Sequence, residues 1–572
     1  MESFSSLVAL LARRAETQPD ERAYLFLNDR GEEESVLTFR ELHEAALALA
    51  ERLTGIARPG DRALLVFPPG VEFLIAFFGC LIAGVIAVPM MPPRRQSARD
   101  SSAGIIANCE PAVALSSAAF ATRNDLQQRF AREGLQWLAV ELTPAGPRAK
   151  NLPEPDAQDI AFLQYTSGST SDPKGVAVTH ANLLANLEMI RLSLGTSRQS
   201  TYVNWVPLYH DMGLILNALE ALYVGALCVL MAPNAFMQRP LNWLRAIHRY
   251  RAEVGCGPNF GYDLCVSRYR ADQMEGIDLS SWKVALNGAE PVHADTIKRF
   301  SEAFAHHGFD PNATFPAYGM AEATLLISGG GRGAGHVTRT VGRAALQSHI
   351  VGAPVDDADV QILVGCGRAL VDERIAIVDP ESRERLPPDR VGEIWVNGLN
   401  VARSYWRNAE ASRTGLSAHI EGDSDGANWL RTGNLGFLDT ASELFITGRI
   451  KDLVIIRGIN HYPQDIEHTV QALHPALRQN GGAVFSVPDE RGDESLVVVQ
   501  EIERTARHSI DGAEMKGLIR EGVTDQHELF ARHIVLIKPG ALPKTTSGKI
   551  QRSLARRLWL ERKFEDLAAE AD

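Results

Sequence analysis

Residues 165–175, YTSGSTSDPKG, combine two glycines, five Ser/Thr hydroxyls and a lysine directly after a short apolar run. Small residues let backbone N–H groups approach anionic oxygens, the hydroxyls add donors, and Lys174 adds a positive charge, so this loop can wrap a polyphosphate. It is not a Walker P-loop, because Pro173 stands where that motif needs its second glycine. Ser/Gly/Thr clusters are more often plain turns, so this loop alone leaves both interpretations open.

Further motifs follow along the chain. They are NGAEPV (287–292), YGMAEAT (318–324), RTGNLGF (431–437), GRIKDLVIIRGINHYPQDIE (448–467) and PKTTSGKIQR (543–552). With these motifs in this order, nearly all of the chain resembles the adenylate-forming superfamily of acyl- and aryl-CoA synthetases, luciferases and peptide-synthetase adenylation domains. Within it, the strings WVPLYHDMGLI (205–215), YGMAEATL, LVGCGRAL (363–370) and RGINHYPQDIE look like fatty acyl-AMP ligases.

The resemblance implies activation of a fatty acid by ATP to an acyl-adenylate, with loss of pyrophosphate, before transfer to a thiol. Such chemistry depends on neutralising charge at the α-phosphate and on the leaving group. By resemblance, Lys549, His210 and Arg449 are the catalytic candidates and Glu322 is the Mg²⁺ ligand. The implied nucleotide-binding residues are Thr166, Ser167, Gly168, Ser169, Thr170, Lys174, Gly288, Ala289, Glu290, Tyr318, Gly319, Met320, Ala321, Asn434, Arg449 and Lys549.

Without the resemblance, each of these residues has an ordinary structural interpretation. A lysine after Ser-Gly, such as Lys549, is usually a solvated turn charge, and a lone histidine is usually structural. Glu322 could equally be a surface charge or a charge at a helix N-terminus. Tyr318 could be a core residue, and Arg449 could be a structural ion-pair partner.

Asn434 departs from the family pattern, which has aspartate at this position to accept hydrogen bonds from both ribose hydroxyls. An amide offers one acceptor oxygen and no charge. We expect ATP binding to be weaker by roughly 1 to 2 kcal/mol, and a weakly active or purely binding homologue stays an alternative.

Short apolar strands alternate with helix-like segments, which predicts an α/β chain of mostly parallel sheets flanked by helices. Closely spaced strands after about residue 390 predict a small antiparallel subdomain. By resemblance, residues 1–447 form the N-terminal adenylation domain, 448–452 a hinge with Lys451 as its pivot, and 453–572 a small mobile α+β lid, a name used below for that segment.

The predicted acyl tunnel combines residues 227–266 with 205–216, although ordinary core packing uses the same residue types. The connection from Gly329 to Arg368 looks like the insertion that keeps the lid of fatty acyl-AMP ligases from the CoA-thioester pose. The expected acceptor is therefore an acyl carrier protein, a separate chain, whose acidic surface could meet the eight Lys/Arg of residues 538–563. A fatty acyl-CoA ligase is the second hypothesis.

Composition bounds the remaining possibilities. A net charge of −12 argues against a nucleic-acid partner. The six scattered cysteines lack metal or disulfide spacing, which favours buried reduced thiols and a cytoplasmic location. The uncharged run from Phe73 to Met91 approaches membrane-spanning length, but its glycines and β-branched cluster predict a buried helix and strand rather than a transmembrane segment. We expect a monomer or weak dimer.

Overall fold

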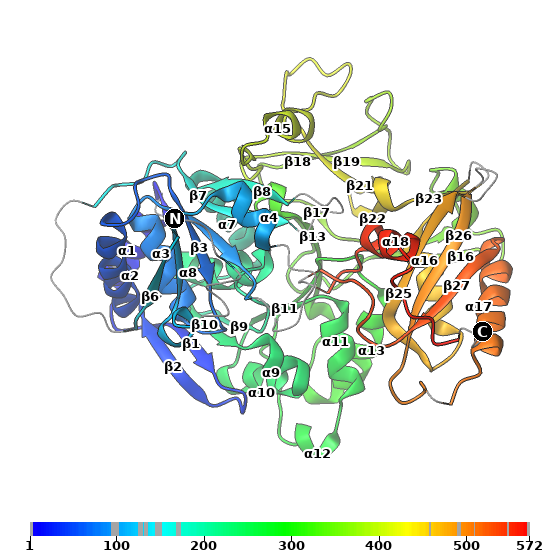
Figure 1. The fold of residues 1–572 in the computed structure, drawn as a ribbon, viewed down its shortest axis with the longest axis horizontal. Coiled ribbons are helices and arrows are strands. Elements are labelled where there is room, and N and C mark those ends of the chain that lie inside the picture. The colour runs from blue at the N-terminus through cyan, green and yellow to red at the C-terminus, as the bar shows by residue number, and fades with distance from the viewer. Residues whose placement is uncertain are drawn as a thin grey trace.

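The computed structural model describes residues 4–92, 102–123, 130, 135–142, 152–166, 173–456, 459–488, 494–507, 509–545 and 548–568 (Figure 1). The larger of two mostly parallel sheets has the spatial order β17 (Arg368–Ala369), β14 (Leu326–Gly329), β13 (Thr314–Gly319), β12 (Val284–Asn287), β11 (Val254–Gly257), β9 (Thr201–Asn204), β10 (Leu227–Met231), β1 (Arg22–Leu27) and β2 (Glu33–Thr38). The strands from β13 to β1 run parallel, and antiparallel strands extend both edges.

The second sheet has the order β20 (Ser404–Tyr405), β8 (Lys174–Thr179), β7 (Ile160–Thr166), β4 (Ile86–Met90), β3 (Arg62–Val66), β5 (Val113–Ser117) and β6 (Gln136–Val140). Its strands from β7 to β6 are parallel, and β8 and β20 are antiparallel additions. Both sheets thus consist mainly of parallel strands, which need helical cover on their faces.

Helices supply that cover. They are α1 (Leu7–Thr17), α2 (Phe39–Thr54), α3 (Glu72–Ile82), α4 (Ser102–Cys109), α5 (Ala118–Ala121), α7 (His180–Leu194), η1 (Met212–Leu219), α8 (Glu220–Val224), α9 (Pro233–Gln238), α10 (Leu241–Tyr250), α11 (Asn259–Ser267), α12 (Ala271–Met274), α13 (Ala294–Phe304), η2 (Ala305–His307), η3 (Pro311–Ala313) and η4 (Ala321–Ala323). Residues from both sheets and most of these helices share one large hydrophobic core.

The uncharged run from Phe73 to Met91 folds as predicted, into buried helix α3 followed by buried strand β4. Gly79 lets α3 lie against α2, because a Cβ there would come within 2.7 Å of Leu49 Cδ2. Within the described parts of the chain, no helix combines the length and apolar character needed to cross a membrane. The run is hydrophobic because it is enclosed on all sides by protein.

An antiparallel sheet follows, with the order β18 (Arg374–Val378), β19 (Gly392–Asn397), β21 (Leu430–Leu438) and β22 (Leu444–Arg449). It lies at the top of Figure 1, with α15 (Ala409–Leu416) above it. The two large parallel sheets and this smaller antiparallel one confirm the predicted fold class of the N-terminal region.

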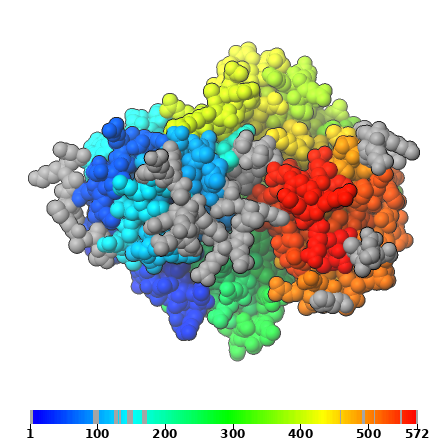
Figure 2. Space-filling model, viewed as in Figure 1, coloured from blue at the N-terminus to red at the C-terminus, as the bar shows by residue number. Residues whose placement is uncertain are grey.

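The lid lies at the right of Figure 1, in orange and red, and forms a lobe beside the rest of the chain in Figure 2. It contains β23 (Val454–Ile456), β24 (Ile459–His461), α16 (Pro463–Ala472), β25 (Leu477–Pro488), β26 (Glu494–Ile502), α17 (Gly512–His527), β27 (Ala531–Ile537) and α18 (Arg552–Leu560), entered through the single turn η5 (Ile450–Asp452). Its buried side chains form clusters of their own on both faces of the β25–β26–β27 sheet. The α+β character is as predicted, while the 448–452 hinge and the lid's mobility stay predictions.

The connection between Gly329 and Arg368 packs against the lid. It folds as β15 (Thr338–Gly342), α14 (Arg343–Gln347) and β16 (Val360–Val364). Tyr462 of the lid is buried among side chains that include Val341 and Leu346. Gln361 Nε2 donates a hydrogen bond to Asp465 Oδ1 at 2.9 Å. The predicted insertion therefore makes both apolar and polar contacts with the first helix of the lid.

We expect this interface to make stability depend on pH through Asp465. Burial raises the pKa of this carboxyl to about 7, against the opposing effects of the Gln361 hydrogen bond and the Arg343 charge. In the unfolded chain an aspartate has a pKa of ~3.9. Keeping Asp465 ionised in the fold therefore costs folding free energy, and this cost grows as pH rises from about 4 to 7.

Asp465→Asn keeps an acceptor oxygen for Gln361 and has no charge to bury. Its melting temperature should exceed that of the wild type at pH 8, and the difference should shrink toward pH 5. A difference that is the same at both pH values would contradict this account.

Candidate functional site

The β21–β22 hairpin brings two predicted site residues to directly opposite positions. Asn434 and Arg449 are register partners on these antiparallel strands. Asn434 Nδ2 donates to the hydroxyl of Tyr318, the penultimate residue of β13, at 2.7 Å. Burial raises the pKa of Tyr318 to about 12, although hydrogen bonds from Thr432 and Asn434 favour its ionised form. The hairpin thus meets the carboxyl end of a parallel strand, where open α/β sheets place ligand sites.

Glu322 lies a few residues beyond Tyr318, on the single turn η4, and is buried. Its Oε1 accepts a hydrogen bond from the Tyr405 hydroxyl at 2.9 Å, and Lys174 Nζ lies 5.0 Å from the centre of the Tyr405 ring. Burial raises the pKa of Glu322, while the charges of Arg449 and Lys174 lower it. The carboxylate of Glu322, the phenol of Tyr405 and the cations Lys174 and Arg449 come from four separate parts of the chain and act on one another.

The backbone between Tyr318 and Glu322 requires a glycine at position 319. A Cβ at this position would lie 1.9 Å from the carbonyl oxygen of Leu325. Met320 N–H donates to the same Leu325 oxygen at 2.8 Å, and Ala321 is buried. The motif YGMAEAT is therefore a tight turn between Tyr318 and Glu322 at the end of β13.

Lys549 reaches this region from the lid. Its backbone closes a hairpin with Thr545, which accepts from Lys549 N–H through Oγ1 at 3.0 Å and donates its own N–H to the Lys549 carbonyl at 2.7 Å. Gly548 packs against the ring of Phe260 on α11. Burial and the charge of Arg449 lower the pKa of Lys549 to about 8, against Asp211, Glu290 and Glu322.

Glu290 follows β12 in the NGAEPV motif and faces the same space. Asn259 Nδ2 donates to Glu290 Oε1 at 3.1 Å. Burial raises the pKa of Glu290, and the Lys549 charge lowers it. Ala289 has a positive φ of 70°, and a Cβ at Gly288 would be 2.8 Å from the Ala317 oxygen, so the loop is held close to β13.

His210 and Asp211 form the remaining part of the site, just before the π-helix η1. His210 Nδ1 lies 2.7 Å from Asp211 Oδ1, which also accepts from the Met212 N–H at 2.7 Å. Although burial opposes it, the nearby His210 and Lys549 keep the pKa of Asp211 below its usual value. Helices of the π type often mark functional sites.

Sequence reasoning missed Asp211 and Tyr405. Asp211 directly follows the predicted site residue His210 in the sequence, and this adjacency was the signal that could have identified it. Tyr405 lies outside every motif, and only the pairing of β20 with β8 brings it to Lys174 and Glu322.

The predicted phosphate loop falls largely outside the described residues, which exclude Ser167, Gly168, Ser169 and Thr170. Thr166 is described only by its backbone, as the last residue of β7, opposite Lys174 in the β7–β8 pair. The described strand ends that flank this segment, Thr166 and Lys174, are therefore paired with each other.

Glu322 fits a magnesium ligand. It is a buried carboxylate with one oxygen held by the Tyr405 hydroxyl. Among the described residues, no group of three His, Cys, Asp or Glu side chains could enclose a metal ion. This suits Mg²⁺, which binds through one or two carboxylates and completes its shell with water and substrate phosphates.

An aromatic layer lies under the Lys549 loop. Trp205 stacks on Phe236 with ring centres 3.8 Å apart and meets Phe260 edge to face at 5.7 Å. Cβ atoms at Gly257 and Gly261 would come within 2.9 and 2.7 Å of the indole, so both glycines are needed for this packing. These residues belong to the segments predicted to line an acyl tunnel, and that role stays a prediction.

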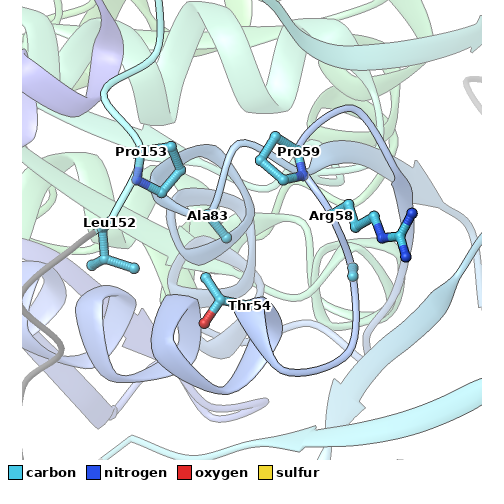
Figure 3. Close-up of a pocket in the computed structure, with 7 residues that line it drawn as sticks. Thr54, Arg58, Pro59, Ala83, Leu152 and Pro153 are labelled. Atoms are coloured by element: carbon cyan, nitrogen blue, oxygen red, sulfur yellow. The ribbon is translucent and has the colours of Figure 1, made fainter.

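A hollow of about 590 Å³ lies elsewhere, over the end of α2 and the turn after α3 (Figure 3). Its lining consists of Thr54, Ala57, Arg58, Pro59, Ala83, Leu152 and Pro153. None of the predicted site residues contributes to it, so it is not the site described above.

Comparisons with known proteins agree with the geometry. The family model described as AMP-binding enzyme matches residues 11–406, and the AMP domain of the Disco-interacting protein 2-like family matches residues 451–569. The chain is 42% identical over 570 residues to the medium-chain-fatty-acid–[acyl-carrier-protein] ligase JamA of Moorena producens, covering 98% of this chain and 95% of the relative.

It is 37% identical over 600 residues to the long-chain-fatty-acid–AMP ligase FadD32 of Mycolicibacterium smegmatis, covering 97% of this chain and 94% of that protein. The crystal structure of a fatty acyl-adenylate ligase from L. pneumophila, in complex with acyl adenylate and pyrophosphate, matches with a TM-score of 0.73 and 39% identity, over 99% of both chains. These similarities confirm the resemblance read from the motifs: the chain belongs to the AMP-binding enzyme family and, within it, to the fatty acyl-AMP ligases.

Proposed function

We propose that this chain uses ATP to convert a medium- or long-chain fatty acid into its acyl-adenylate and then transfers the acyl group to the phosphopantetheine thiol of a separate acyl carrier protein. The observation that carries the proposal is the meeting of Lys549 from the lid with Arg449 and the carboxylates Asp211, Glu290 and Glu322. The relatives named above act on the same class of acid.

In the first step, an oxygen of the fatty-acid carboxylate attacks the α-phosphorus of ATP. The new P–O bond forms as the bond to the bridging oxygen breaks, and pyrophosphate leaves with the electron pair. In the second step, the carrier thiol attacks the acyl carbonyl, AMP leaves, and the thiol proton is released. The first step concentrates negative charge at phosphorus, so positioned cations lower its barrier.

Each residue of the site has a role in this proposal. Lys549 neutralises charge between the carboxylate and the α-phosphate, and Lys174 and the adjoining loop hold the outer phosphates. Tyr318, Asn434 and Arg449 hold the nucleoside, with Gly288 and Ala289 along the base. A bound Mg²⁺ would supply charge neutralisation to the phosphates, held by Glu322. His210, oriented by Asp211, lies at the entrance for the acyl carboxylate.

The preference for a carrier protein over free CoA rests on the contacts of the insertion with the lid. Tyr462 and Asp465 of the lid both contact the segment from Val341 to Gln361, and turning the lid would break these contacts. The basic stretch 538–563 supports carrier docking less than its composition suggests, because several of its cations are engaged within the lid. Such pairs join Lys538 to Glu565, Arg552 to Glu467, Arg556 to the Ser486 carbonyl and Lys563 to Glu561.

The products distinguish this proposal from its alternatives. Purified protein is incubated with Mg-ATP and fatty acids of increasing chain length, with CoA or with a phosphopantetheinylated carrier protein, and the products are followed by mass spectrometry. We expect acyl-AMP that CoA leaves unconverted and that the carrier consumes. Acyl-CoA would make the chain a CoA ligase, and bound nucleotide without any adenylate would make it a binding homologue.

Lys549→Ala should lower the rate of acyl-AMP formation by roughly 10²-fold or more, the effect of losing one preorganised charge. Acyl transfer from supplied acyl-AMP should persist, since in that step the thiol attacks the acyl carbon and not the α-phosphorus, and the proposal gives Lys549 no role there. Lys563→Ala, which removes a lid lysine outside the site, is the matched control. Near-normal adenylation by the Lys549 variant would remove this residue from the mechanism.

The pH dependence of the adenylation rate should reflect the ionisation of Lys549. With its pKa lowered to about 8, Lys549 loses its proton as pH rises through 8, so kcat/KM for adenylation should fall above that pH. Lys549→Arg keeps its charge, so its lower activity should stay level up to about pH 10. A falling limb that persists in the arginine variant would assign it to another group.

Asn434→Asp should lower the KM for ATP by about 5- to 30-fold, corresponding to the ~1 to 2 kcal/mol of a charge-assisted bond to ribose. In the native chain the amide nitrogen is engaged by Tyr318, so one oxygen remains for the nucleotide. Asn434→Ala should raise KM. An unchanged KM in the aspartate variant would show that this position does not limit ATP binding.

A further inference from the structure

Glu501 is a fully buried carboxylate near the end of β26, in the interior of the lid. Its Oε1 accepts hydrogen bonds from the backbone N–H groups of Gly540 and Leu542, at 2.8 and 2.9 Å. Its Oε2 accepts from Arg478 Nη1 at 2.9 Å. A buried carboxylate is costly unless such partners satisfy it, and charge-assisted bonds to backbone N–H groups are among the stronger hydrogen bonds in proteins.

The two N–H groups belong to the turn that follows β27 and leads to Lys549. Beyond Leu542, the chain forms a closed hairpin in which Gln551 N–H donates to the Pro543 carbonyl at 2.9 Å. Lys549 lies near the tip of that hairpin. Glu501 attaches the root of this hairpin to the β-sheet of the lid, and Lys544 Nζ adds a second contact by donating to the Asn480 carbonyl of β25 at 2.5 Å.

We infer that Glu501 is a positioning residue for adenylation: its carboxylate fixes the root of the 543–551 hairpin and so holds Lys549 at the reacting groups. The inference rests on the proposed function for the role of Lys549. Glu501 itself is not a site residue, and its hydrogen-bond partners Gly540, Leu542 and Arg478 are not among the predicted substrate contacts.

This role predicts an effect on one half-reaction only. A misplacement of about 1 Å can cost 10²-fold in rate when a charged group must meet a transition state. Acyl transfer to a thiol does not use Lys549 in the proposed mechanism. Glu501→Ala should therefore lower acyl-AMP formation by about 10²-fold and leave the KM for ATP and the transfer from supplied acyl-AMP within about threefold of wild type.

Two conservative variants separate hairpin positioning from the ion pair with Arg478. Glu501→Gln retains an oxygen at the place of Oε1 but loses the charge opposite Arg478. Glu501→Asp retains the charge but is one methylene too short to reach both N–H groups. We expect adenylation in the order Gln above Asp above Ala; if Ala does not fold, the order of Gln and Asp decides.

Asp566 provides a matched control in the same lid. It accepts from the backbone N–H groups of Leu536 and Ala568, at 3.2 and 3.1 Å, and from Lys516 Nζ at 2.7 Å, but it holds no part of the Lys549 hairpin. Asp566→Ala should lower the melting temperature and leave the ratio of adenylation to transfer unchanged.

Equal losses in both half-reactions for Glu501→Ala, or an Asp variant as active in adenylation as the Gln variant, would overturn the inference. Wild type and Lys549→Ala are measured alongside. A wild type that forms no acyl-AMP would defeat the proposed function itself, whereas normal adenylation by the Glu501 variants beside a defective Lys549→Ala would defeat only this inference.

Discussion

The cations Lys549, Arg449 and Lys174 come from distant parts of the chain, and the buried carboxylate of Glu322 interacts with all three. Burial and Arg449 lower the pKa of Lys549, and Asp211, Glu290 and Glu322 oppose that shift. Like charges in a region of low dielectric repel strongly unless opposite charges or a ligand compensate. The arrangement is therefore suited to an anionic substrate, which adds negative charge where cations from distant parts of the chain meet.

The rest of the fold serves this meeting of charges. The parallel sheet presents Tyr318 and Glu322 at its carboxyl edge, and the β21–β22 hairpin brings Asn434 and Arg449 to them. The lid supplies Lys549, which lies on the 543–551 hairpin. The segment from β15 to β16 contacts the lid through Tyr462 and Asp465. Under the proposed function, activation and transfer place opposite demands on these contacts, since a firm hold favours the first step and release favours the second.

The sequence alone predicted residues that the structure brings together, because the motifs carry both residue identity and order. The motifs placed Lys549 and Glu322 in one site, and the uncharged run from Phe73 to Met91 could be recognised as helix and strand from its glycines and β-branched residues. Tyr405 and Glu501 could not be found in this way. Their roles depend on which strands pair and on which turn a carboxylate reaches. Neither residue lies in a motif or a periodic pattern, so a single sequence does not reveal these tertiary contacts.

The most direct test of this account is a crystal structure of the chain with a fatty acid and α,β-methylene-ATP, which cannot release pyrophosphate. The account predicts Lys549 Nζ within hydrogen-bond distance of both the carboxylate and the α-phosphate, with Asn434 and Arg449 at the ribose and a metal ion on Glu322. Lys549 pointing to solvent while both substrates are bound, or a nucleotide away from Asn434 and Arg449, would contradict it.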